Sequence, residues 1–310
     1  MSFLDRLQKS AHKSELDYSN TSPGFFCLLV VSQICLAVCL GRALSGRFLL
    51  AGLLGIGFHW VGFVTSLLLG TNKFYDITED VCILHMLACS YFTVSNGAPN
   101  LRTSLVYLCA AVWCTRLVAY VGYRVFVRGH DFRFEKLNKG VAYNLFAWTS
   151  GGLWCFFNFF SLWKLADDKR QTLSNGLDIL DYIGFSIFAI GFYIEIVADI
   201  EKWNFNAAFK FGENNKWIAT GMWGYSRHPN YCGEIMLWFG LSICCIGGLE
   251  GLARASVVDL ITCAVSPVWS CIFLVFTSLM LLEKRADQKW GGMKHYEKYK
   301  KTTPVLFPGW

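Results

Sequence analysis

The sequence predicts an all-α membrane protein, a polytopic transmembrane helical bundle of six to eight spans. Only 16% of the 310 residues are charged, whereas roughly a quarter are charged in a typical soluble domain. The mean hydropathy is +0.39. Long apolar runs with few interior charges recur along the chain, and several approach the roughly 20 residues that a helix needs to cross the hydrocarbon layer. Together these observations argue against an ordinary soluble globular domain.

Six apolar runs predict transmembrane helices. They cover residues 25–41, 48–70, 103–123, 178–198, 233–249 and 257–282. Two shorter or more polar candidates, at 81–95 and 142–163, extend the count to eight. The polar segment 1–22 lacks the apolar region of a signal peptide, so we expect the first span to remain in the mature protein. Residues 23–310 are expected to form a single membrane domain.

The basic residues are clustered rather than spread evenly. The net charge is +6, and the clusters lie at 116–139 and at 284–301. Basic segments beside membrane spans tend to stay in the cytoplasm, so an even number of spans places both termini on the cytoplasmic side. Because the basic residues flank apolar runs instead of covering a soluble face, we expect no binding to nucleic acid.

The cysteines and histidines show no spacing typical of a metal site. Most of the 13 cysteines lie inside apolar runs, without a CxxC pair or a combined Cys/His pattern. Buried thiols behave as small hydrophobic groups, and the six histidines are scattered. We therefore expect no metal among the cofactors.

A first group of charged residues lies within the apolar run that begins near 178. Glu195 and Asp199 are four residues apart and share one helix face. Lys202 is three residues further along and can reach Asp199. Ionisable groups inside a span usually face a cavity or a charged partner. The alternative is a helix end at which Asp199 and Lys202 meet the lipid headgroups.

A second group surrounds the expected start of the next helix. Pro229 suits the first turn of a helix, where its missing N–H costs nothing. Arg227 and His228 come directly before it, and Asn230 and Glu234 share one helix face beyond it. Helix N-termini bind phosphate, and arginine adds a planar bidentate donor. The pattern predicts an anion site with a polar wall; the alternative is a capped span with an interfacial arginine.

These motifs resemble those of a known family. YSRHPNYCGE, with EIVADIEKWNF before it and LEKRADQKWG and YEKYKKTTPVLFP after it, is similar to the C-terminal domain of steroid 5-alpha-reductases. The likeness is greatest to the domain-of-unknown-function 1295 subfamily, and covers about 115–308, including the DFRF at 131–134. It implies a membrane oxidoreductase that uses NADPH to reduce a carbon–carbon double bond in a steroid, isoprenoid or other lipid. In a eukaryote, the endoplasmic reticulum is the expected location.

The resemblance also implies a cytosol-facing cofactor site in a C-terminal half, 141–310, and a substrate-selecting half, 23–140. The implied cofactor-binding residues are Glu195, Asp199, Lys202, Arg227, His228, Asn230, Tyr231 and Glu234. Basic residues near this site, including Lys284 and Arg285, favour NADPH over NADH. Tyr231 and His85 are the candidate catalytic residues, because either could donate the proton that completes the reduction.

Two other functions remain open. RHPxY also occurs in isoprenylcysteine carboxyl methyltransferases and phospholipid methyltransferases, which bind S-adenosylmethionine. Their tails carry a Glu before a Tyr-rich segment, as Glu283 and Tyr296 do here. Gly233 followed by Glu234, together with ADIEK, favours the reductase. The third reading is a non-catalytic lipid-binding protein, against which the intact charged motif argues. All three readings expect a lipid-like small molecule and membrane lipids as partners.

Overall fold

The structure is a computed structural model, and it is helical almost throughout the part of the chain that it describes. The described residues are 22–44, 46–94, 100–128, 140–168, 176–209, 216–249 and 255–307. None of these residues forms a β-strand, which agrees with the predicted all-α bundle. Most of the polar N-terminal segment and the DFRF motif at 131–134 lie outside the described residues.

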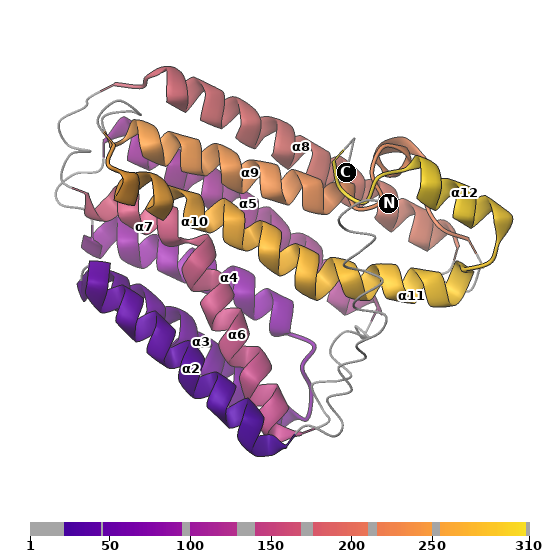
Figure 1. Ribbon diagram of the computed structural model, residues 1–310, viewed down its shortest axis with the longest axis horizontal. Helices are drawn as coiled ribbons and strands as arrows, with labels where there is room; N and C mark the ends of the chain where they lie inside the picture. Colours follow the sequence, from indigo (N-terminus) through magenta and orange to yellow (C-terminus); the bar gives the residue numbers. More distant parts are fainter. Residues whose placement is uncertain are drawn as a thin grey trace. The chain divides into compact units, whose positions relative to one another are not determined.

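Figure 1 shows the helices coloured along the chain. In chain order they are α2 (Pro23–Leu44), α3 (Gly46–Leu69), α4 (Tyr75–Cys89), α5 (Leu101–Arg128), α6 (Val141–Asn158), α7 (Phe160–Asp167), α8 (Ile179–Ala208), α9 (Pro229–Gly247), α10 (Val257–Phe273), α11 (Met280–Trp290) and α12 (Lys294–Thr302). Two π-helical segments, η2 (Ser90–Val94) and η7 (Leu274–Leu279), and the 3₁₀ turn η6 (Gly221–Gly224) complete the described elements.

Five helical stretches in the described residues are long and apolar enough to cross a membrane. They are Phe48–Leu69, Leu101–Val127, Ile179–Ala208, Pro229–Gly247 and Val257–Trp290. Each contains most of one predicted run, and α2 contains the remaining one. Helices α4 and α6 overlap the two shorter candidates. The prediction of a polytopic helical membrane protein is therefore confirmed, and large apolar side chains on the exposed faces of these helices suit contact with lipid.

The chain divides into two compact units. Among the described residues, the N-terminal unit lies within Asp17–Tyr182 and Leu241–Ser266, and the C-terminal unit lies within Ile183–Gly240 and Pro267–Trp310. Helices α6 and α7 thus belong to the N-terminal unit, although the predicted cofactor half begins at residue 141.

In the N-terminal unit, glycines allow helices α3 and α6 to pack backbone against backbone. A Cβ added to Gly55 would lie only 2.7 Å from the carbonyl oxygen of Gly152. Further along the same pair of helices, the ring of Trp148 occupies the space beside Gly62. The hydrophobic effect does not drive helices together inside lipid, so small residues that allow close van der Waals packing stabilise helix pairs there. These contacts fix the register between α3 and α6.

A buried ion pair joins the starts of α5 and α8. The Arg102 guanidinium donates from Nε to both carboxylate oxygens of Asp181, at 2.8 and 2.9 Å, and from Nη2 at 2.7 Å. Both side chains are almost fully buried, whereas Asp178, 3.5 Å from the same Nη2, is 41% exposed. Because the Arg102–Asp181 pair is buried and the Asp178 carboxylate is partly exposed, loss of Asp181 should lower the stability more than loss of Asp178.

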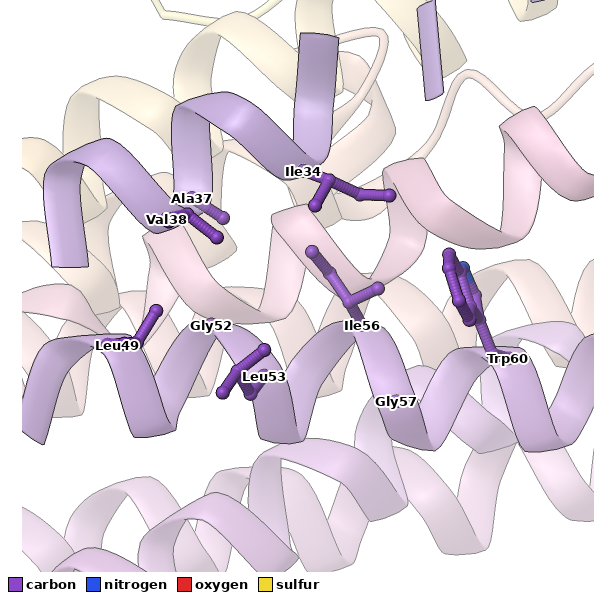
Figure 2. A pocket seen from close by; sticks show the side chains of 9 residues that line it. All are labelled: Ile34, Ala37, Val38, Leu49, Gly52, Leu53, Ile56, Gly57 and Trp60. Atoms are coloured by element: carbon purple, nitrogen blue, oxygen red, sulfur yellow. The ribbon is translucent and has the colours of Figure 1, made fainter. Parts of the chain in front are cut away.

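The N-terminal unit also contains an apolar pocket between α2 and α3 (Figure 2). Its volume is about 160 Å³. The lining residues are Ile34, Ala37, Val38, Leu49, Gly52, Leu53, Ile56, Gly57 and Trp60. Such a surface suits a hydrocarbon chain and offers almost nothing to a polar ligand.

In the C-terminal unit, α8 and α9 are antiparallel and also meet through glycine. A Cβ on Gly191 would lie 2.6 Å from the carbonyl oxygen of Gly233, and Gly240 lies against the backbone of Gly184. A separate apolar core holds α9, η7 and the chain after α12 together. Its buried members are Ile235, Leu274, Val275, Leu279, Val305 and Leu306.

Helices α10 and α11 form one long helical stretch, Val257–Trp290 (Figure 1). Between them lies η7, a π-helical segment in which the backbone hydrogen bonds span five residues instead of four. Pro267 lies inside α10, where proline removes a backbone donor and bends a helix. The stretch ends at a turn in which Gly292 adopts a φ of 82°, a conformation that glycine accepts at little cost. Helix α12 follows that turn.

Candidate functional site

Three buried ionisable side chains meet at the start of α9. Glu283 on α11 accepts from Arg227 Nη2 at 3.0 Å through one carboxylate oxygen and from His228 Nε2 at 2.8 Å through the other. Each of the three residues is at least 93% buried. We call Arg227, His228 and Glu283 the RH–E cluster. Two residues directly before α9 and one residue on α11 thus form a compact buried cluster within the C-terminal unit.

The chain after α12 holds this cluster in place. The backbone N–H of Arg227 donates to Pro304 O at 2.9 Å, and Arg227 Nη1 donates to Lys300 O at 3.4 Å. Ser226 Oγ donates to Val305 O and accepts from the His228 N–H at 3.2 Å. These contacts fix the residues before Pro229, which begins α9 as the sequence predicts.

Burial favours the neutral form of His228. Burial lowers the pKa of His228, the Glu283 carboxylate opposes that shift, and the charges of Lys202 and Arg227 add to it. In the neutral form, Nε2–H donates to Glu283, so Nδ1 carries a free lone pair. The ring of Tyr231 stacks on His228 with centroids 5.7 Å apart and planes 12° apart.

The cluster leaves buried polar atoms that no described residue satisfies. They are Arg227 Nε, His228 Nδ1 and Asn230 Oδ1. A buried polar group without a partner costs about 1–3 kcal/mol, so such groups in a native structure require an explanation. One donor and two acceptors at the same helix start are suited to a ligand that carries both an anionic group and hydrogen-bond donors.

The predicted residues on α8 belong to the same unit. Glu195 and Asp199 are both buried. Glu195 packs against α9, since a Cβ on Gly233 would lie 3.0 Å from the Glu195 Cβ. The Lys202 ammonium lies 4.4 Å from the centre of the Trp223 ring, a cation–π geometry. Glu234 is half-buried on α9.

The C-terminal helices add a layer of aromatic and charged contacts. Tyr299 donates to Trp223 O at 2.7 Å, and Tyr296 donates to Asp287 at 3.2 Å. Lys300 contacts the same Asp287 carboxylate at 2.6 Å. Burial raises the pKa of Tyr296 and of Tyr299 far above the usual value. Both hydroxyls therefore stay protonated and act as hydrogen-bond donors.

Two residues that the sequence predicts at the site, His85 and Arg285, are not members of the RH–E cluster. His85 belongs to the N-terminal unit, where its ring stacks on Phe58 at 5.8 Å and its Nε2 lies 3.6 Å from Cys89 Sγ. Arg285 is exposed on α11, so it lies on a different face from buried Glu283. The sequence assigns Glu283 only to the methyltransferase pattern and not to the reductase site. The feature that could have identified it is its position as an acidic residue at the end of a long apolar run.

The comparison with known proteins gives a family match. The model of the family described as "Protein of unknown function (DUF1295)" matches residues 62–303. This range includes α9 and α11 and therefore the whole RH–E cluster. No curated protein and no solved structure has significant similarity to the chain.

Proposed function

Because the chain belongs to the DUF1295 family, and because the RH–E cluster is suited to an anionic cofactor, we propose that it is a membrane oxidoreductase. The reaction is the NADPH-dependent reduction of a carbon–carbon double bond in a steroid, isoprenoid or other lipid. The observation that supports this most is the RH–E cluster with its unsatisfied buried atoms at the start of α9.

The unsatisfied buried polar atoms at the start of α9 suit the hydrogen-bonding groups of NADPH. Arg227 Nε–H and the N-terminal end of α9 favour a phosphate oxygen. His228 Nδ1 and Asn230 Oδ1 are acceptors, suited to hydroxyl or amide donors of a dinucleotide. Glu283 orients the guanidinium and imidazole, in the way that a supporting carboxylate orients a binding residue. Lys202 and Lys300 add positive charge near the same helix start.

Bound NADPH supplies a hydride to one alkene carbon, and the protein must supply a proton to the other. Tyr231 is the proposed proton donor, and its ring stacks on His228. The hydrogen bond from His228 Nε2 to Glu283 fixes the imidazole on which the Tyr231 ring stacks. His85 remains the second candidate donor. The apolar pocket of Figure 2 is a suitable place for a lipid hydrocarbon chain.

A methyltransferase that uses S-adenosylmethionine is the second candidate. The specific observation in its favour is Glu283, which follows the methyltransferase tail pattern and contacts both Arg227 and His228. The gathering of basic residues around the cluster favours the reductase, because a dinucleotide carries more negative charge. A lipid-binding protein without catalysis would bind neither cofactor.

Titration of the purified, detergent-solubilised protein with NADPH, NADH and S-adenosylmethionine tests the proposal. We expect NADPH to bind most tightly. Arg227→Ala should weaken NADPH binding by about 10- to 150-fold, the equivalent of losing a charged hydrogen bond of about 1.5–3 kcal/mol. Arg285→Ala, an exposed arginine on α11, is the matched control and should bind normally.

The competing functions give different results in the same titration. Binding of S-adenosylmethionine but not NADPH would move the assignment to a methyltransferase. Binding of neither cofactor by protein with a cooperative thermal transition would refute the reductase. Equal affinity for NADPH and NADH would remove the preference for the phosphorylated cofactor.

A further inference from the structure

A second polar cluster lies in the N-terminal unit, on helices that carry none of the residues assigned to the cofactor. His59 on α3, Cys82 on α4 and Cys155 on α6 each have an exposed fraction of 0%. The nearest nitrogen of His59 and the two sulfur atoms all lie within 4.8 Å of one another. We propose that these three side chains bind a zinc ion that joins α3, α4 and α6. This proposal does not depend on the reductase function.

His59 is prepared as a ligand by the hydrogen bond at its other nitrogen. Nδ1 lies 2.9 Å from Gly55 O, so Nδ1 carries the proton and donates it. Nε2 therefore carries the lone pair, and this buried atom has no hydrogen-bond partner among the described residues. A metal-bound histidine usually has its second nitrogen fixed by a carbonyl or carboxylate in this way.

The distances require little adjustment. Tetrahedral zinc with sulfur at about 2.3 Å and nitrogen at about 2.0–2.1 Å separates its ligand atoms by about 3.5–3.8 Å. Atoms within 4.8 Å of one another reach that spacing through a contraction of at most about 1.3 Å, within the range of side-chain rotation. At present Cys155 Sγ donates to Glu79 O at 3.4 Å, and Cys82 Sγ contacts Met86 Sδ at 3.9 Å.

The helix packing places the three ligands together. Gly55 and Gly152 bring the α3 and α6 backbones into contact one turn from His59 and Cys155. The space beside Gly151 is filled by His59, by the Tyr75 hydroxyl and by a carboxylate oxygen of Glu79, each within 3.0 Å of an added Cβ. Polar groups therefore surround the cluster on the side of α4, where a fourth ligand would approach.

Charge balance favours a divalent ion. Binding to the two thiols releases two protons and forms two thiolate–metal bonds, so Zn²⁺ with two thiolates is neutral apart from its fourth ligand. A neutral complex is the one that a buried apolar site tolerates best. Thiolate and imidazole ligands select zinc rather than calcium or magnesium. A water molecule in the fourth position keeps the complex neutral, whereas the Glu79 carboxylate would make it an anion.

Metal analysis of the full-length protein, purified in detergent with reductant and without chelators, tests the site. We expect about one zinc per chain. Cys82→Ser and Cys155→Ser should each weaken zinc binding by at least about 100-fold, in line with the effect of disturbing a metal site. Cys114→Ser is the matched control, because Cys114 is equally buried on α5 and lies outside the cluster. Wild-type-like zinc in both cluster variants would overturn the proposal.

A measurement on the wild-type chain covers the case in which the cluster variants fail to fold. After removal of the metal, Co²⁺ should give thiolate-to-cobalt charge-transfer absorption and tetrahedral d–d bands. Adding zinc to the metal-free protein should also slow the alkylation of Cys82 and Cys155, but not that of exposed Cys27. Absence of both the cobalt spectrum and the protection would overturn the proposal. So would copper in place of zinc, or a Cys82–Cys155 disulfide found by mass spectrometry in freshly purified protein.

Discussion

Glu283 offers a direct test of how the RH–E cluster is built. Its two carboxylate oxygens contact Arg227 at 3.0 Å and His228 at 2.8 Å, and the side chain is 3% exposed. Glu283→Gln keeps the shape and one hydrogen-bond acceptor but removes the charge that balances buried Arg227. We expect the folded state to be strongly destabilised, because an uncompensated buried charge is left behind.

The expected cost follows from burial. Removing one partner of a buried ion pair costs about 3–5 kcal/mol, whereas exposed pairs contribute about 0–1 kcal/mol. Asp287 on the same helix provides the control, since its pair with Lys300 is short, at 2.6 Å, but 20–30% exposed. We therefore expect Asp287→Asn to cost no more than about 1 kcal/mol. Adding Arg227→Met to Glu283→Gln removes both charges and should recover about 2 kcal/mol or more.

Unfolding of the purified variants in detergent, followed by circular dichroism, measures these differences. Glu283→Gln should lower the Tm by roughly 10 °C, using about 2–4 °C per kcal/mol for large domains. Equal effects of Glu283→Gln and Asp287→Asn would refute the burial argument. A double variant less stable than Glu283→Gln would show that the charge on Arg227 is balanced by another group.

Three further predictions use the same unfolding assay. Asp181→Asn removes the fully buried charged partner of Arg102 and should lower the unfolding free energy by about 3–5 kcal/mol. Asp178→Asn, at a 41% exposed carboxylate, should lower it by less than about 1 kcal/mol. Equal losses for the two variants would contradict the burial argument. Since burial lowers the pKa of His228 in the folded state, only the unfolded chain gains this proton as pH falls below about 6.5. Stability should then fall by up to about 1.4 kcal/mol per pH unit, and His228→Gln should lack that contribution. Gly55→Ala would place a Cβ 2.7 Å from a backbone oxygen of α6 and should destabilise, whereas Gly57, with nothing within 4 Å, should accept alanine and gain up to about 1 kcal/mol.

Local features of the sequence predicted the elements and part of the site. The length and apolarity of the runs gave the helices, because a span needs a long uncharged stretch whatever its neighbours are. Pro229 marked the start of α9, since proline is favoured in the first turn of a helix. The four-residue spacing of Glu195 and Asp199 predicted that both lie on one face, and both are buried.

Contacts between distant helices could not be predicted in this way. Glu283 joins Arg227 only because α11 packs beside the start of α9, which no local pattern encodes. His59, Cys82 and Cys155 come from three helices, so their linear spacing resembles no known ligand motif. The expectation of no metal rested on that spacing, and spacing reports only ligands that share one element or one loop.

The π-helical segment η7 has a consequence for the whole C-terminal end of the chain. Successive residues of an α-helix are separated by about 100° around its axis, and a π turn accommodates one additional residue. Everything beyond Leu279 is therefore rotated by about a quarter of a turn relative to an uninterrupted helix. That rotation sets which side of α11 carries Glu283 and which carries Arg285. One additional residue in a helix is thus enough to bring a carboxylate to a new face, without changing any residue of the site itself.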